Sequence, residues 1–367
     1  KRQARTRAAG LPTPLSVKLE LENFAGSGDA EGTDILEATL SLARVLELGD
    51  KSRLRGELAR QNAELLRSEQ DSQRLDLLAE TTELFLAVVT NQERLAIAHQ
   101  ATTLANDTQT VVEGRFKAGR TPAAERSRAI IEVARAEIER EHAEHQLAVS
   151  RLRLVAAWGQ TEPHFSMAAG DLFALDEVAD FDNLEHRLEQ NPDLVRLATA
   201  KRLAEARTRL VQADRRANID VAGGIRYLND SDDVALVLSA SMPLGSRKRA
   251  APAIEESEML GLAEPLAFEQ RRLELYTTLF EIHQELLHSH TAVDTLRRRI
   301  IPEAERALRD LEKGYALGRY SFLELLSAQR TLLDARLEAV QVAADYHRYQ
   351  TQIERLTGGG MTTGATP

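Results

Sequence analysis

Residues 314–326 read GYALGRYSFLELL, and they open a long helical pattern. A related stretch at residues 115–126 reads RFKAGRTPAAER and opens a second long helical pattern. The glycines at the centre of these stretches, Gly119 and Gly318, are 199 residues apart. A repeat of this length is much longer than a solenoid unit, so it predicts that the chain contains a duplicated domain.

Each copy begins with two short segments in which apolar and polar residues alternate. They lie at about 15–23 and 36–46 in the first copy, and at about 218–228 and 233–243 in the second. Alternation over about ten residues is typical of a strand with one apolar face, and this length suits a tilted transmembrane β-strand. The alternative is a pair of hairpins in a half-buried soluble sheet.

Strict alternation also predicts which side chains share a face. If the strands span a membrane, the side chains expected to face lipid are Leu19, Leu40, Val221 and Leu238. Those expected to face the lumen are Glu20, Ser41, Asp220 and Ser239.

Each strand pair is followed by a very long helical stretch. Residues 51–113 contain no proline and a single glycine, and they are rich in strong helix formers. At roughly 1.5 Å per residue, this stretch predicts a rod of about 95 Å. The matching stretch, residues 246–313, contains Pro252, Pro265 and Pro302 as expected boundaries or kinks. Each rod turns at its central glycine and returns, which predicts antiparallel helical hairpins packed like coiled coils.

Four strands cannot close a barrel, and open sheet edges are not tolerated in lipid. If the strands span a membrane, several chains must therefore pool them. Three chains give twelve strands, an even number within the range of outer-membrane barrels. The helical hairpins then extend from the barrel as a tube.

These residues resemble the outer membrane factors, the TolC-like channels of tripartite efflux systems. The resemblance rests mainly on residues 314–326 and 116–126. The stretches LELENFAGSG at 19–28 and LSLARVLELG at 40–49 resemble the cobalt–zinc–cadmium efflux subgroup. The resemblance implies an α+β membrane protein: a homotrimeric twelve-stranded β-barrel, four strands per chain, continuous with a periplasmic α-helical barrel. It implies a location in the outer membrane of a Gram-negative bacterium.

The expected organisation is two structural repeats and a tail. The first repeat covers residues 1–181, with a hairpin at about 51–158 and an equatorial segment at about 160–181. The second covers residues 182–358, with a hairpin at about 246–357, and residues 359–367 form a flexible tail. The second copy has a helical stretch before its first strand, whereas only residues 1–9 precede the first strand of copy one. We therefore expect that most of a first helix precedes the given sequence. The resemblance implies that a secretory signal precedes it as well, and many members of the family carry a lipidated cysteine behind that signal.

The implied function is a passive efflux duct that receives heavy-metal cations from an inner-membrane RND transporter through a periplasmic adaptor protein. A second hypothesis is a TolC-like channel for drug efflux or type I protein secretion. A third is a soluble coiled-coil scaffold that uses two short sheets for assembly.

The resemblance also assigns roles at the two tips. Glu125 and Glu324 match acidic residues that face the lumen near the periplasmic aperture, and Tyr315 matches a tyrosine of the closing network. Tyr320 stands where that network often has a basic residue, which Arg319 or Arg126 could replace. The residues expected to dock the adaptor lie in the turns: Gly119, Thr121, Gly318 and Ser321.

Composition limits the other function classes. A net charge of −10 argues against a nucleic-acid partner, and the absence of cysteine removes disulfides and thiolate metal sites. His142 and His145 are spaced for a divalent ion on a helix, but a solvated helix face is the simpler interpretation. We expect no resident metal, no cofactor and no enzyme activity, because no nucleophile or phosphate-binding motif occurs.

Overall fold

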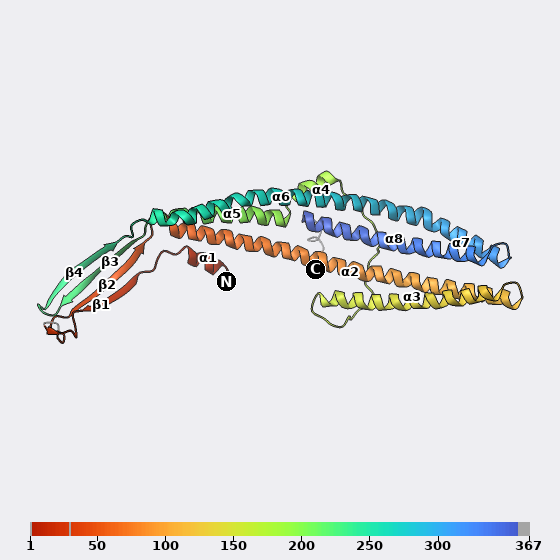
Figure 1. Ribbon diagram of the computed structural model, residues 1–367, viewed down its shortest axis with the longest axis horizontal. Helices are drawn as coiled ribbons and strands as arrows, with labels where there is room; N and C mark the ends of the chain where they lie inside the picture. Colours follow the sequence, from red (N-terminus) through yellow and green to blue (C-terminus); the bar gives the residue numbers. More distant parts are fainter. Residues whose placement is uncertain (1, 29–30, 359–367) are drawn as a thin grey trace. The chain divides into compact units, whose positions relative to one another are not determined.

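The computed structural model describes residues 2–28 and 31–358 (Figure 1). It divides into two compact units. Unit 1 comprises Lys1–Asp71 and Pro192–Arg272, and unit 2 comprises Ser72–Asn191 and Leu273–Pro367. Each unit therefore combines a segment from the first half of the chain with a segment from the second. The expected flexible tail at 359–367 lies outside the described residues.

Unit 1 holds a four-stranded antiparallel sheet with the strands in sequence order. The two central strands come from different halves of the chain and pair from Glu37 opposite Leu228 to Leu46 opposite Ile219. The sheet thus joins the two copies of the repeat. The strands are β1 Ser16–Glu22, β2 Glu37–Leu46, β3 Ile219–Leu228 and β4 Asp233–Ser241.

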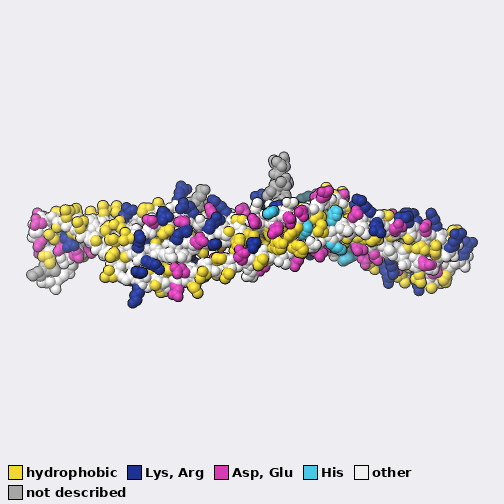
Figure 2. Space-filling model, turned by 90° about the horizontal axis from the view of Figure 1, so that it is seen from above, with side chains coloured by type: hydrophobic (Ala, Val, Ile, Leu, Met, Phe, Trp, Pro, Cys, Tyr) yellow, Lys and Arg dark blue, Asp and Glu magenta, His cyan; other side chains and the backbone are white. Residues whose placement is uncertain are grey.

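The register gives the sheet one apolar face. Leu19 lies opposite Leu40, Leu40 opposite Ile225, and Ile225 opposite Leu236. Because side chains alternate along each strand, Val221 and Leu238 share this face, as the sequence predicted. Leu238 is 88% exposed, and hydrophobic side chains are visible over the sheet at the left of Figure 2. An exposed apolar surface of this kind marks a contact with lipid or protein.

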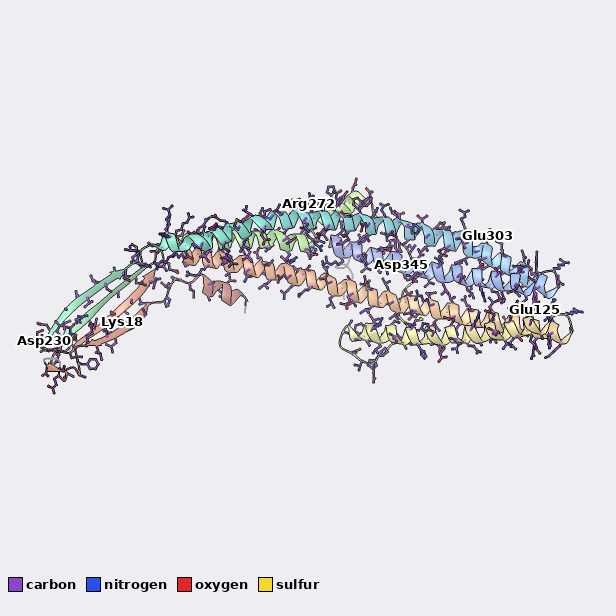
Figure 3. All side chains as sticks on the ribbon, viewed as in Figure 1. Lys18, Glu125, Asp230, Arg272, Glu303 and Asp345 are labelled. Carbon is purple, nitrogen blue, oxygen red and sulfur yellow. The ribbon has the colours of Figure 1, made fainter. Side chains whose placement is uncertain are left out.

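The opposite face of the sheet is polar and contains a charged network. Arg226 donates to Glu37, to Glu22 Oε2 at 3.1 Å and to Thr39 Oγ1 at 2.9 Å. Lys18, labelled in Figure 3, lies 2.8 Å from Glu20. The residues predicted to face inward, Glu20, Ser41, Asp220 and Ser239, all belong to this face by register.

In unit 1, a buried lysine at the start of a long helix bonds the segment that leads into strand β3. Lys51 donates to the Arg216 carbonyl and to Asn218 Oδ1, both at 2.8 Å, and lies 3.4 Å from Asp214. A buried ammonium group is tolerated only when it is paired in this way. The helices of this unit are α1 Arg2–Ala9, α5 Pro192–Ala213, and the first parts of α2 Lys51–Lys117 and α6 Ser246–Thr295.

Unit 2 consists of helices, among which α7 and α8 are packed together. Besides the remaining parts of α2 and α6, it contains α3 Ala123–Ala156, α4 Phe181–Leu188, a π-helical turn Leu296–Ile300, α7 Ile301–Ala316 and α8 Phe322–Thr357. The described helices include none that is both long and apolar enough to cross a membrane.

The three prolines behave differently from one another. Helix α6 continues past both Pro252 and Pro265, so neither is a helix boundary. Pro302 is the second residue of α7, which begins directly after the π-helical turn. Proline lacks an N–H group and its ring collides with the preceding turn of an α-helix, and the wider π turn relieves both problems.

The core of unit 2 includes the irregular segment between α3 and α4. Ala168 and Leu172 from this segment are buried in one cluster with Val88 and Val89 of α2. Gln92 holds Ala168 by two hydrogen bonds: its Oε1 accepts from the backbone N–H at 2.7 Å, and its Nε2 donates to the carbonyl at 3.0 Å. The segment is therefore a fixed part of the unit.

Candidate functional site at the hairpin tips

The two helical hairpins of unit 2 reverse direction through the same turn. At the end of α2, the N–H of Arg120 bonds the carbonyl of Arg115 at 2.9 Å, and Gly119 adopts a φ of 67°. At the end of α7, the N–H of Arg319 bonds the carbonyl of Gly314 at 2.8 Å, and Gly318 adopts a φ of 78°. Both turns are Schellman motifs, in which a left-handed glycine closes the helix.

The returning helices begin differently. Ser321 caps α8 through a capping box: its hydroxyl accepts from the Glu324 N–H at 3.3 Å, while Glu324 Oε2 accepts from the Ser321 N–H at 2.7 Å. The equivalent cap of α3 is Pro122, which has no side chain that can accept a hydrogen bond. The 199-residue register therefore pairs Ser321 with Pro122, and Tyr320 with Thr121.

The capping box favours the charged form of Glu324. Hydrogen bonds from the backbone and the hydroxyl of Ser321 hold the pKa of Glu324 below its ordinary value of 4.5. A lowered pKa means that the cap stabilises the folded tip above pH 4.5, and that this contribution is lost as the pH falls through the lowered pKa.

Glu125 connects the two tips. Its Oε2 accepts from Thr121 Oγ1 at 2.6 Å and from the hydroxyl of Tyr315, on the other hairpin, at 3.1 Å. Tyr315 is 2% exposed and its ring lies 5.9 Å from that of Phe322. Burial raises the pKa of Tyr315 above its ordinary value of 10.0, so the hydroxyl keeps its proton and remains a donor at neutral pH. Figure 3 labels Glu125 near the tip of the first hairpin.

The structure therefore brings together only part of the predicted aperture set. Glu125, Thr121 and Tyr315 form one hydrogen-bonded group. Glu324 bonds Ser321 instead, and Tyr320 packs its ring over Gly314. A Cβ atom built on Gly119 meets nothing within 4 Å, so this glycine lies in open space. The two glutamates occupy the same position in their helices but have different partners.

Of the two arginines that we considered as substitute cations, Arg126 is engaged within its own hairpin. Its Nε donates to Glu113 Oε2 at 2.6 Å, and its guanidinium lies 5.3 Å from the ring centre of Phe116. The sequence assigned no role to Arg115, which donates to the Tyr315 carbonyl at 2.5 Å. Arg115 lies in the tip stretch that occurs in both copies, and the equivalent residue of the second copy is Gly314.

The histidines show no metal cluster. Across residues 2–28 and 31–358, no group of three or more His, Asp or Glu side chains is arranged to hold an ion. His142 lines a groove of about 640 Å³ among α2, α3 and α8, together with apolar residues such as Leu333 and Leu337.

An exposed apolar sheet face and two very long helical hairpins are the features expected of an outer-membrane channel of the family that the sequence resembles. The family profile of the outer membrane efflux proteins matches residues 2–160 and 183–359, and the chain belongs to this family. It is an outer-membrane protein with a periplasmic extension.

Individual proteins are similar to this chain in sequence or in fold. The chain is 28% identical to the cobalt-zinc-cadmium resistance protein CzcC of Cupriavidus metallidurans over 320 residues, which cover 85% of this chain and 75% of that protein. The fold is similar to that of CusC, with a TM-score of 0.81 and 17% identity, covering 98% of this chain and 86% of that one. It is also similar to the MtrE outer membrane channel of Neisseria gonorrhoeae, with a TM-score of 0.79, 18% identity, and coverage of 99% and 84%.

Proposed function

We propose that three copies of this chain form a passive duct for heavy-metal cations through the outer membrane. The observation that carries the proposal is the exposed apolar face of an open four-stranded sheet, in a chain of the outer membrane efflux family. The edge strands β1 and β4 each have an unpaired side, and lipid offers no partners for their backbone groups. Three chains satisfy these edges in a closed barrel of twelve strands.

The name of one relative supports the proposed cargo. CzcC is named as a cobalt-zinc-cadmium resistance protein, and its match to most of this chain supports divalent cations as the cargo. The polar sheet face, with its acidic side chains, is suited to line a path for cations. The duct has no catalytic role, and it receives cations from an inner-membrane RND transporter through a periplasmic adaptor.

Within this assembly, residues 1–181 and 182–358 act as two structural repeats, each contributing two strands and one hairpin. We assign the aperture to the hairpin tips, where Glu125, Tyr315, Glu324 and Tyr320 lie. The adaptor docks on the turns that contain Gly119, Thr121, Gly318 and Ser321. Support for the aperture comes from Glu125, whose carboxylate bonds both hairpins at once.

The decisive experiment is to purify the protein in detergent and reconstitute it in a planar bilayer. We expect a trimer that stays assembled in detergent and produces discrete, cation-selective conductance steps. A protein that remains soluble and monomeric without detergent would contradict the channel and favour the scaffold hypothesis. Conductance that does not distinguish cations from anions would reject the proposed cargo while leaving the duct itself intact.

A further inference from the structure

Arg115 makes a further contact between the tips of the two hairpins. It lies in the last turn of α2, and its Nη1 donates to the carbonyls of Tyr315 at 2.5 Å and Ala316 at 3.1 Å. Its guanidinium also lies 4.7 Å from the centre of the Tyr315 ring. One side chain of the first hairpin therefore holds the last turn of α7, in the second hairpin, by two hydrogen bonds and a cation–π contact.

The acceptors of these bonds are suited to a cation. The last carbonyls of a helix lack partners within the helix and carry the negative end of its dipole. The Tyr315 carbonyl already accepts the Gly318 N–H at 2.9 Å, so Arg115 binds at the point where the tip turn closes. Arg115 Nε is buried and has no hydrogen-bond partner among the described residues. An unsatisfied buried donor costs free energy, which makes the contact easier to break.

The contact has no counterpart from the second hairpin. The residue 199 positions after Arg115 is Gly314, which has no side chain to reach the first hairpin. The Tyr320 ring lies so close to Gly314 that any side chain there would overlap it. The duplicated tips have therefore diverged: at the position of Arg115, the second hairpin has no side chain that can reach the first.

Arg115 and Glu125 hold the same residue from two sides. Glu125 accepts from the Tyr315 hydroxyl at 3.1 Å, whereas Arg115 bonds the Tyr315 backbone. We propose that Arg115 is a positioning residue of the aperture: by fixing the last turn of α7, it places Tyr315 for its bond to Glu125 and keeps the two tips together. This inference rests on the proposed function, in which the tips form the aperture.

The main test compares channels of the full-length trimer in planar bilayers. Arg115→Met keeps the aliphatic length of the side chain but donates no hydrogen bond. We expect it to raise the ratio of open to closed time at least about tenfold, which corresponds to about 1.4 kcal/mol. Arg120→Met is the matched control, because it removes an exposed positive charge from the same tip. It should leave the ratio unchanged.

A double variant of Arg115 and Tyr315 tests whether Arg115 positions Tyr315 or only stabilises the end of α7. Tyr315→Phe removes the bond to Glu125 and leaves the backbone carbonyl in place. If Arg115 positions Tyr315, the double variant should open no more than the stronger single variant, because both changes break one contact. Independent, additive effects would show that Arg115 only stabilises the end of α7, and would overturn the proposal.

A lysine variant keeps the test available if Arg115→Met fails to assemble. Arg115→Lys retains the charge but cannot form the same forked contact, so we expect an intermediate open ratio. The chain contains no cysteine, so spin labels on Ala118→Cys and Leu317→Cys report the distance between the tips without background. Loss of Arg115 should increase the mean distance between the labels and broaden the distribution of that distance. An unchanged distance, or normal gating in a conducting Arg115→Lys channel, would refute the role of Arg115, whereas a parent that does not conduct refutes the proposed function instead.

Discussion

At the scale of single residues, the two tips show how equivalent positions acquire different partners. Glu125 and Glu324 are each the third residue of a helix, where a carboxylate is favoured by the helix dipole. Ser321 is available as a cap in the second tip, so Glu324 completes a capping box. Pro122 replaces that serine in the first tip, and the carboxylate of Glu125 instead binds Thr121 and Tyr315.

A pair of substitutions tests whether these carboxylates face the conducting path. Glu125→Gln with Glu324→Gln should lower cation selectivity and weaken block by divalent or trivalent cations added on the periplasmic side. The physical reason is that three chains lose six negative charges around a narrow opening. Single-channel recording measures both quantities. Glu303→Gln, an exposed site on α7, is the control (Figure 3). Selectivity and block equal to those of the parent would place both residues away from the path.

At the scale of elements, the sheet depends on alternation and register together. Alternation divides each strand into an apolar and a polar side, and the register aligns the apolar sides of all four strands on one face. A shift of one residue in any pairing would move charged side chains such as Glu20 or Arg226 onto the apolar face. The Arg226 network with Glu22 and Glu37 crosses three strands and helps to fix this register.

Neighbouring residues of β4 test which face meets lipid. Leu238→Arg places a charge on the apolar face and should destabilise the inserted barrel by about 2–4 kcal/mol, because the guanidinium is transferred into hydrocarbon. Ser239→Arg places the same charge on the polar face and should be tolerated, with a change in conductance. Denaturant unfolding of trimers in lipid vesicles measures the difference. Equal tolerance of the two variants would contradict the membrane assignment of this face.

At the scale of the whole molecule, the duplication is visible in how the two halves are combined. Each compact unit contains a part of both halves, and the central strand pair β2–β3 joins them. At the tips, Arg115 and Glu125 from the first half bond Tyr315 from the second. The four-stranded sheet and the contacts between the tips therefore require both halves.

A cellular experiment tests the proposed cargo. A strain that lacks its outer-membrane efflux channel, but retains the adaptor and pump of a cobalt–zinc–cadmium system, should regain tolerance to these cations when it expresses this chain. The growth limit in added zinc, cobalt or cadmium measures the recovery, and tolerance to an organic drug serves as the comparison. Restored drug tolerance without restored metal tolerance would favour the drug-efflux hypothesis.

The sequence by itself determined the kinds of element and their order. Strand alternation and helix propensity act over a few residues, so the four strands, the long helices and the glycine turns can be predicted from the local sequence. The repeat of 199 residues further indicated that the two tips are equivalent. This equivalence made Glu125 and Glu324 look alike, although the residues that differ beside them, Pro122 and Ser321, were already in the sequence.

Only the tertiary structure decided which groups meet across the chain. The Arg115 contact joins residues that are 200 positions apart, and the bond between Glu125 and Tyr315 spans 190. Such contacts depend on how one hairpin packs against the other, and no local pattern records that packing. Arg115 lies in the last turn of α2, and its contact with the end of α7 forms only because α7 ends within reach of its side chain.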